Sequence, residues 1–155
     1  MEPDGATGLA AAQERRRERM ETLSLSPPEE LERIASLFAG CPEPVTVRAA
    51  ETGLVMVRGR IAGHGAAFNL GEVLASRCVV SVEGVLGFGY TLFPDERHAY
   101  LAALCDALGG HRDYAGPVER ELAALRRRRA ETVSRDEAEA VGTRVEFFTM
   151  VRGDD

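Results

Sequence analysis

The chain has 155 residues, of which 45% are apolar, and it carries 19 basic and 25 acidic residues for a net charge of −6. This length fits one domain with an ordinary buried core. The negative balance excludes a protein that binds nucleic acid over its whole surface. Every basic residue is an arginine, so a Schiff-base lysine and a phosphate-loop lysine are also excluded.

Three cysteines, Cys41, Cys78 and Cys105, have neither the number nor the spacing of a disulfide framework or a zinc site. We expect them to be buried or half-buried thiols in a reducing cytosol. The charged N-terminal region lacks the apolar core of a signal peptide, and no stretch approaches the ~20 apolar residues of a membrane span. The sequence therefore predicts a cytoplasmic protein without membrane contact.

Two helices are expected at the start of the chain. Residues 9–23 form the first, and their basic run at 15–19 is interleaved with glutamates, which favours a solvated or partner-facing helix over a nucleic-acid arm. Ser26 is expected to cap the second helix, and Gly40 to end it. The apolar stripe of this second helix comprises Leu31, Ile34, Leu37 and Phe38.

The pattern then changes to period two. Residues 45–50 and 54–61 predict two strands joined through a turn at 51–53, and residues 68–70 predict a short edge strand. These segments indicate a sheet built largely from neighbouring antiparallel strands.

The clearest hairpin joins residues 78–82 to residues 85–92 through a two-residue turn at 83–84. On its second strand, Gly87 and Gly89 share one face, and the large apolar side chains share the other. A face bared by two glycines lets another backbone approach closely. A packed helix is the expected neighbour, in preference to a ligand.

Two further helices are predicted, from about residue 94 to 108 and from about residue 117 onward. The apolar face of the last helix fades halfway along. Such a helix is solvent-bridging or leans on something outside the chain. The apolar residues that mark its first half are Val118, Leu122 and Leu125.

Residues 145–151 are the most strand-like stretch of the sequence, and they must join the domain's own sheet or dock on a partner. We expect an α+β fold with a mostly antiparallel sheet of four to six strands and about four helices. Residues 1–23 are assigned to an N-terminal extension, and residues 24–155 to a single domain. The candidate partner-interface residues are Phe147, Phe148, Met150, Val151 and Arg152.

Catalytic equipment is sparse, so no complete active site, bound cofactor or metal is expected in this chain alone. None of the three histidines has the spacing of a metal site. His98 is interpreted first as a polar residue at a helix end and second as a general acid–base at an intersubunit site. His111 is expected on a loop surface.

Arg48 and Glu51 form a charged pair that pins a turn, or they present Arg48 to a phosphate. With His98 and Arg144, they are the candidates for a contribution to a shared catalytic site.

Two segments resemble the signature stretches of the PhnG family of phosphonate carbon–phosphorus lyase subunits: residues 48–55, RAAETGLV, and residues 144–154, RVEFFTMVRGD. The resemblance runs from about residue 28 to 154. Two departures are His64, where the family can carry a non-titratable residue, and an N-terminal helix that is longer than usual.

The resemblance implies a non-autonomous subunit that is required, with the H, I and L subunits, to transfer an alkylphosphonate to C1′ of ATP. The products would be ribose 1-alkylphosphonate 5-triphosphate and adenine. ATP and Mg²⁺ would belong to the complex and not to this chain. The implied partners are the H, I and J core subunits, I most directly, and transiently the ATP-binding-cassette-like K and L subunits.

The alternative is a small cytosolic regulatory protein whose basic helices bind nucleic acid. It depends on the arginine runs at 15–19 and 126–129. Across residues 112–139, however, seven arginines meet seven acidic residues, which favours a salt-bridged, solvated helix face.

Overall fold

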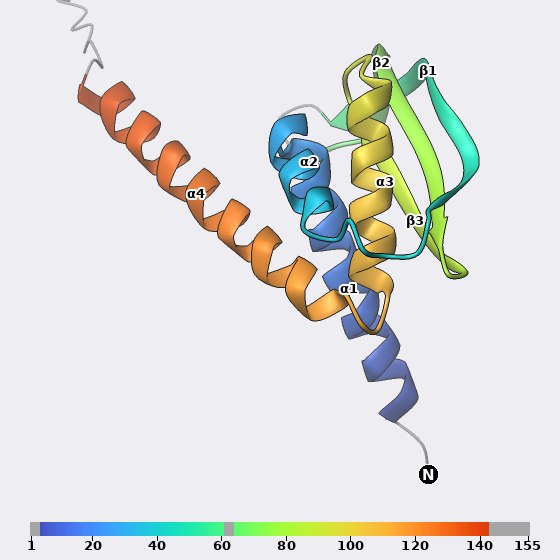
Figure 1. Ribbon diagram of the computed structural model, residues 1–155. Helices are drawn as coiled ribbons and strands as arrows, with labels where there is room; N and C mark the ends of the chain where they lie inside the picture. The colour runs from blue at the N-terminus through green and yellow to red at the C-terminus, as the bar shows by residue number, and fades with distance from the viewer. Residues whose placement is uncertain (1–3, 61–63, 143–155) are drawn as a thin grey trace, which may run out of the picture.

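The computed structural model describes residues 4–60 and 64–142 of the chain. Figure 1 shows helix α3 lying between a twisted antiparallel sheet and the other helices, while α4 runs away from the sheet. The elements are α1 (Asp4–Leu25), α2 (Pro28–Ser36), β1 (Val45–Arg60), β2 (Ala67–Val82), β3 (Val85–Thr91), α3 (Glu96–Gly110) and α4 (Ala115–Gly142). The α+β class and the four helices are confirmed.

The sheet differs from the expectation of four to six strands. In the described part of the chain it has three strands, in the order β1-β2-β3. Residues 68–70 are not a separate edge strand, because they belong to the beginning of β2. The segment 145–151, for which the sequence predicts a strand, lies outside the described residues.

The predicted turn at residues 51–53 is also wrong, because β1 runs through this segment without reversing. Thr52 and Gly53 remain paired with Ser76 and Ala75 of β2. The register shifts between Thr46 and Glu51 instead, so β1 carries an irregularity of the bulge type there. A glycine within a strand pattern fits a bulge as well as a turn, and pairing with β2 decides between them.

The β2–β3 hairpin is as predicted. Glu83 and Gly84 both have positive φ, 48° and 82°, as a tight two-residue turn between twisted strands requires. The glycine face of β3 receives α3. A Cβ built on Gly87 would lie 2.0 Å from the carbonyl oxygen of Ala103, and one built on Gly89 would lie 1.7 Å from that of Ala99. The expected close backbone approach is therefore confirmed, and the neighbour is a helix.

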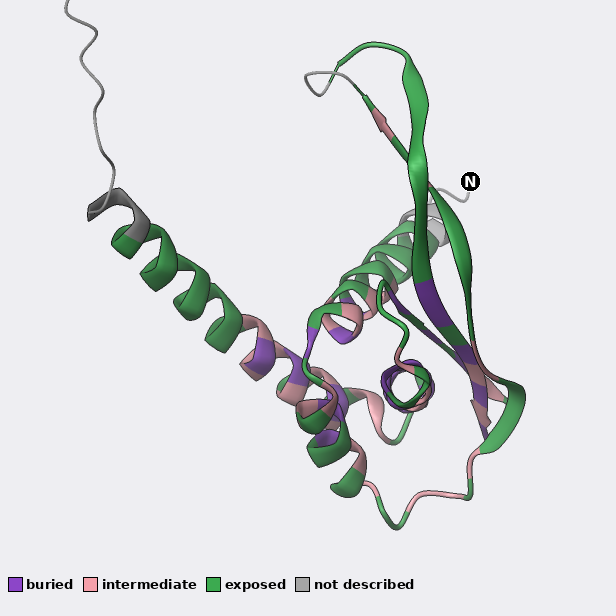
Figure 2. Ribbon diagram, turned by 90° about the horizontal axis from the view of Figure 1, so that it is seen from above, coloured by how far each residue is buried: buried purple, intermediate pink, exposed green. Residues whose placement is uncertain are grey.

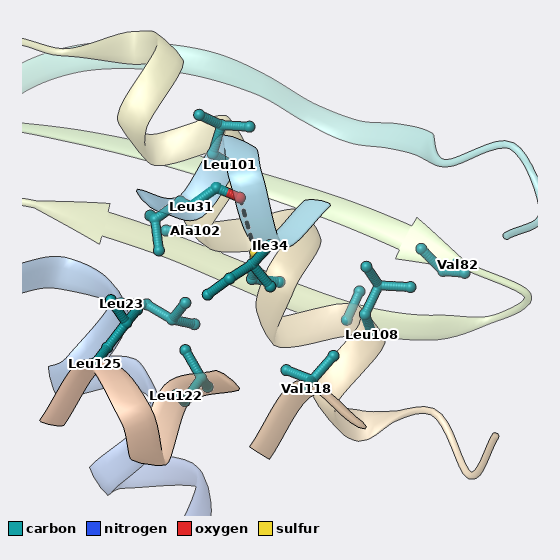
Figure 3. Close-up of a cluster of buried hydrophobic side chains, with 12 residues drawn as sticks. Leu23, Leu31, Ile34, Val82, Leu101, Ala102, Leu108, Val118, Leu122 and Leu125 are labelled. Carbon is teal, nitrogen blue, oxygen red and sulfur yellow. Dashed lines mark hydrogen bonds between the residues drawn. The ribbon is translucent and has the colours of Figure 1, made fainter. Parts of the chain in front are cut away.

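The main core lies where the four helices meet the end of β2 (Figure 3). Helices α2 and α4 contribute residues from one stripe each, α1 contributes Leu23, and α3 is buried on nearly all sides, so burial of these apolar side chains holds the helices together. Its largest fully buried side chains are Leu23, Leu31, Ile34, Val82, Leu108, Val118 and Leu122.

Helix capping differs in part from the prediction. Ser26 does not cap α2, because its hydroxyl donates a hydrogen bond of 2.7 Å to the carbonyl of Thr22 in α1. Pro27 occupies the cap position without a side-chain hydrogen bond. In α3 the cap is Asp95, whose carboxylate accepts a hydrogen bond of 2.8 Å from the backbone N–H of His98.

The fading of the α4 stripe is confirmed. Val118, Leu122 and Leu125 are buried, whereas residues 127–139 are all exposed. Figure 2 shows this outer half of α4 extending from the body of the molecule. Its stability therefore owes little to packing within the described part of the chain.

A buried carboxylate joins α1, α3 and β3. The Asp106 side chain of α3 is inaccessible to solvent, and its Oδ1 accepts a hydrogen bond of 2.9 Å from Nε of Arg19. Its Oδ2 accepts from Nη2 of Arg16 at 2.7 Å and from the backbone N–H of Phe88 at 3.0 Å. Charge-assisted hydrogen bonds of this kind offset the cost of burying the carboxylate.

The sequence predicts that the basic run at 15–19 faces solvent or a partner, and this network shows that two of its arginines do not. Arg19 is buried, and it also donates to the carbonyl of Gly109 at 2.9 Å and to Glu119 of α4 at 3.2 Å. Arg16 lies over the ring of Phe88, 5.1 Å from its centroid. These two arginines therefore face the protein, whereas their neighbours Arg15 and Arg17 face solvent.

Substitution of Asp106 tests the network. Asp106→Asn removes the charge that neutralises Arg19 while nearly preserving shape, so we expect the free energy of unfolding to fall by about 3 kcal/mol. Asp113→Asn is the control, because that side chain is 62% exposed, and its effect should stay within about 0.5 kcal/mol. Urea unfolding followed by circular dichroism measures both, and equal effects would contradict the assigned role.

Substitution of Gly89 tests the close contact between β3 and α3. Gly89→Ala places a methyl group against the backbone of α3, so α3 must shift, and we expect a loss of about 2–3 kcal/mol of stability. Gly53→Ala is the matched control, since a Cβ built on Gly53 would meet nothing within 4 Å. A Gly89→Ala protein as stable as Gly53→Ala would refute the contact.

Candidate functional site

Charged side chains gather on the outer face of the sheet, the face turned away from α3. Glu51 Oε1 lies 2.7 Å from Nε of Arg77 on β2 and 3.0 Å from Nε of Arg48. All three side chains are about half exposed. The hydrogen bond from Arg77, with the positive charge of Arg48, holds the pKa of Glu51 below its ordinary value.

The predicted Arg48–Glu51 pair is thus present, although it lies at the β1 irregularity and not at a turn. Sequence reasoning missed Arg77 as the second partner of Glu51. The register of β1 and β2 places Arg77 directly opposite Glu51, and that register could not be read without knowing that β1 continues past residue 51. Two guanidinium groups on one carboxylate leave a net positive charge, which can meet an anionic substrate or an acidic partner surface.

His98 lies on the other side of the sheet, in α3. It is only 7% exposed, and its Nε2 lies 2.9 Å from the carbonyl oxygen of Leu23 in the last turn of α1. The carbonyls of a last turn lack partners within their own helix, so this hydrogen bond satisfies one of them. The structure does not bring His98 together with Arg48 and Glu51.

His111 is not a surface loop residue, which corrects the sequence expectation. Its side chain is buried, with Nε2 3.0 Å from a carboxylate oxygen of Glu83 in the β2–β3 turn. Its ring also lies 4.9 Å from that of Tyr114. Residues 109 and 110, at which the sequence predicts the end of α3, instead form its last turn and bring His111 beneath the hairpin. His64 is exposed.

The remaining predicted site residues lie outside the described residues. They are Arg144 and the partner-interface candidates Phe147, Phe148, Met150, Val151 and Arg152.

The cysteines are free thiols, with Cys78 and Cys105 buried and Cys41 half-buried, as predicted. Burial, with a smaller contribution from the charge of Asp106, raises the pKa of Cys105 to about 12. Cys105 is therefore a neutral thiol near pH 7 and a poor nucleophile.

Metal-binding clusters and membrane-spanning helices are both absent from residues 4–60 and 64–142. No group of three His, Cys, Asp or Glu side chains gathers there in a way that could hold a metal ion. Within the same residues, no helix has the length and apolar character needed to cross a membrane.

Exposed apolar side chains gather on a two-stranded arm, residues 53–60 of β1 and 67–75 of β2. Figure 2 shows this arm extending beyond the helices, exposed along most of its length. Along β2, burial begins only at Ala75 and Ser76. Exposed apolar side chains of the arm are Leu54, Val55, Met56, Phe68, Leu70, Val73 and Leu74.

An arm of this kind fits an interaction surface. An isolated two-stranded ribbon is at best marginally stable in water. Contiguous exposed apolar side chains mark sites of protein–protein contact more often than ordinary surface. The structure therefore offers an exposed charged group at Glu51 and, on the same two strands, an apolar arm suited to a partner.

The comparisons with known proteins both identify the same family. The family described as "Phosphonate metabolism protein PhnG" matches residues 14–153. The chain is also 43% identical, over 145 residues and 90% of each sequence, to a Rhizobium meliloti (strain 1021) protein named "Alpha-D-ribose 1-methylphosphonate 5-triphosphate synthase subunit PhnG". On both grounds, this chain belongs to the PhnG family.

Proposed function

We propose that this chain is a non-autonomous subunit of the carbon–phosphorus lyase complex. It acts with the H, I and L subunits in the transfer of an alkylphosphonate to C1′ of ATP, which gives ribose 1-alkylphosphonate 5-triphosphate and adenine. The name of the Rhizobium relative supports this reaction. The observation that carries the proposed subunit role is the apolar arm of β1 and β2, which needs a partner to cover it.

The chemistry of the reaction also favours a supporting role. Displacement of adenine builds positive charge on the ribose, and the triphosphate needs Mg²⁺ or several cations. The charged group at Glu51 is a poor acid–base, because Arg77 and Arg48 stabilise the ionised carboxylate. His98 is buried against a backbone carbonyl. Mg²⁺ and ATP are therefore assigned to the complex, with the main catalytic residues on other subunits.

The I subunit is the proposed direct partner, with H and J in the same core and the K and L subunits as transient partners in the cytoplasm. The arm and the five candidates between residues 147 and 152 are the proposed contacts. A role in binding nucleic acid is disfavoured, since Arg16 and Arg19 are engaged by Asp106.

Co-expression with the I subunit tests the assembly role. We expect an affinity-tagged chain to co-purify with the I subunit. Leu54→Ser combined with Met56→Ser should lower the amount captured about tenfold, because buried apolar anchors dominate interface energies. Leu9→Ser is the control, since Leu9 and Leu54 are similarly exposed, at 65% and 63%, and it should change nothing. A chain that remains alone in co-expression would contradict the proposal.

A second substitution separates assembly from catalysis. Glu51→Gln should leave both co-purification and adenine release by the assembled complex within about threefold of the parent. Loss of a true general acid or base costs roughly 10²–10⁴-fold in rate. A loss of that size in a correctly assembled complex would place Glu51 in the catalytic site and would refute the purely supporting role.

A further inference from the structure

The side of α4 that is buried in its first half continues into the exposed second half, where two of the three residues are charged. Leu122 and Leu125 are buried, and the next positions on the same side of the helix, three or four residues apart, are Arg129, Val133 and Asp136. Val133 is 46% exposed, and Arg129 and Asp136 are also exposed. The stripe therefore changes from apolar to the order positive, apolar, negative.

A groove runs beside this half of α4, between it and the corner where α1 meets α2. Its apolar lining includes Leu25, Leu125 and Val133. Its volume is about 940 Å³, which leaves room for side chains of a neighbouring helix. The stretch from Arg129 to Asp136 spans about two helical turns.

If two copies of this stripe face each other, opposite charges meet in only one of the two relative orientations of the helices. An antiparallel copy of the helix places Arg129 opposite Asp136 and brings the two Val133 side chains close to the two-fold axis. Every contact then occurs twice, as in any isologous dimer. A parallel copy would instead place Arg129 against Arg129 and Asp136 against Asp136. Opposite charges therefore select the antiparallel pair.

The charges at the two ends of the stripe are weakly engaged within one chain. In the described residues no carboxylate lies within salt-bridge distance of Arg129, although its neighbour Arg128 lies 3.1 Å from Glu30. Asp136 lies 3.8 Å from the adjacent Arg135, and both of these side chains are largely exposed. Arg129 and Asp136 can therefore form the intermolecular pairs without breaking a strong contact.

We propose that α4 pairs with α4 of a second copy of this chain, antiparallel about a two-fold axis near Val133, so that each helix enters the groove of the other. This inference does not depend on the proposed function. The interface is small and partly ionic, so the association is concentration-dependent and weakens as salt screens the Arg129–Asp136 pairs.

Charge exchange on the full-length chain tests the pairing. Arg129→Asp and Asp136→Arg each place like charges opposite one another, so each variant alone should dimerise at least about tenfold more weakly in sedimentation equilibrium. An equimolar mixture of the two should recover the dimer, because in the mixed pair the substituted positions again bring opposite charges together. Arg127→Asp is the matched control, since residue 127 lies on the opposite side of α4 from Arg129 and Asp136.

A cross-link measures the geometry directly. In a Cys41→Ser background, Val133→Cys should form an intermolecular disulfide under mild oxidation, whereas Arg127→Cys should not. Cys78 and Cys105 are buried and do not interfere. The cross-link is measured on the chain alone and on the complex captured with the I subunit, so the result does not depend on the behaviour of the isolated chain.

Three results would overturn the pairing. One is the absence of a Val133→Cys cross-link both in the chain alone and in the captured complex. The second is a mixture of Arg129→Asp and Asp136→Arg that associates no better than either variant. The third is loss of I-subunit capture by Arg129→Asp with self-association unchanged, which would assign the stripe to a different partner. Failure of I-subunit capture by the parent chain bears on the proposed function alone.

Discussion

The carboxylate of Asp106 is held by Arg16 and Arg19 of α1 and by the backbone of Phe88 in β3, and the arrangement of the elements depends on this contact. An unpaired carboxylate in this position would be strongly destabilising. The need to pair this carboxylate fixes α1 against α3 and against the edge of β3 that does not pair with β2, and Arg19 continues the network to Glu119 in α4. Asp106 thus links α1, α3 and β3 through one charge, and Arg16 and Arg19 of the basic run are engaged within the fold, whereas Arg15 and Arg17 face solvent.

Features encoded by neighbouring residues could be predicted from the sequence. The β2–β3 hairpin follows from a two-residue turn with Gly84, and the seat for α3 follows from Gly87 and Gly89 on one face of β3. The fading of the α4 stripe is equally local. Features that depend on distant partners could not be predicted. Arg19 and Asp106 are 87 residues apart, and no local pattern states that a surface-like arginine meets a buried carboxylate.

The candidate site shows the same division. The pairing of Arg48 with Glu51 is close in sequence and could be predicted, whereas Arg77 enters only through the register of β1 and β2. That register could not be derived from the sequence, because Gly53 suggests that the strand ends in a turn. In the structure, pairing with β2 continues the strand through Gly53 instead. The long β1 that results is what creates the exposed arm, so the missed bulge and the missed interaction surface have one physical cause.

In the proposed assembly the chain folds around its own core, and another subunit covers the arm of β1 and β2. Hydrogen–deuterium exchange of the chain, free and bound to the I subunit, tests this coverage. We expect slow exchange in α3 in both states, and rapid exchange at residues 53–60 and 67–75 that becomes slow only in the complex. Equal protection of the arm in the free and bound chain would contradict it.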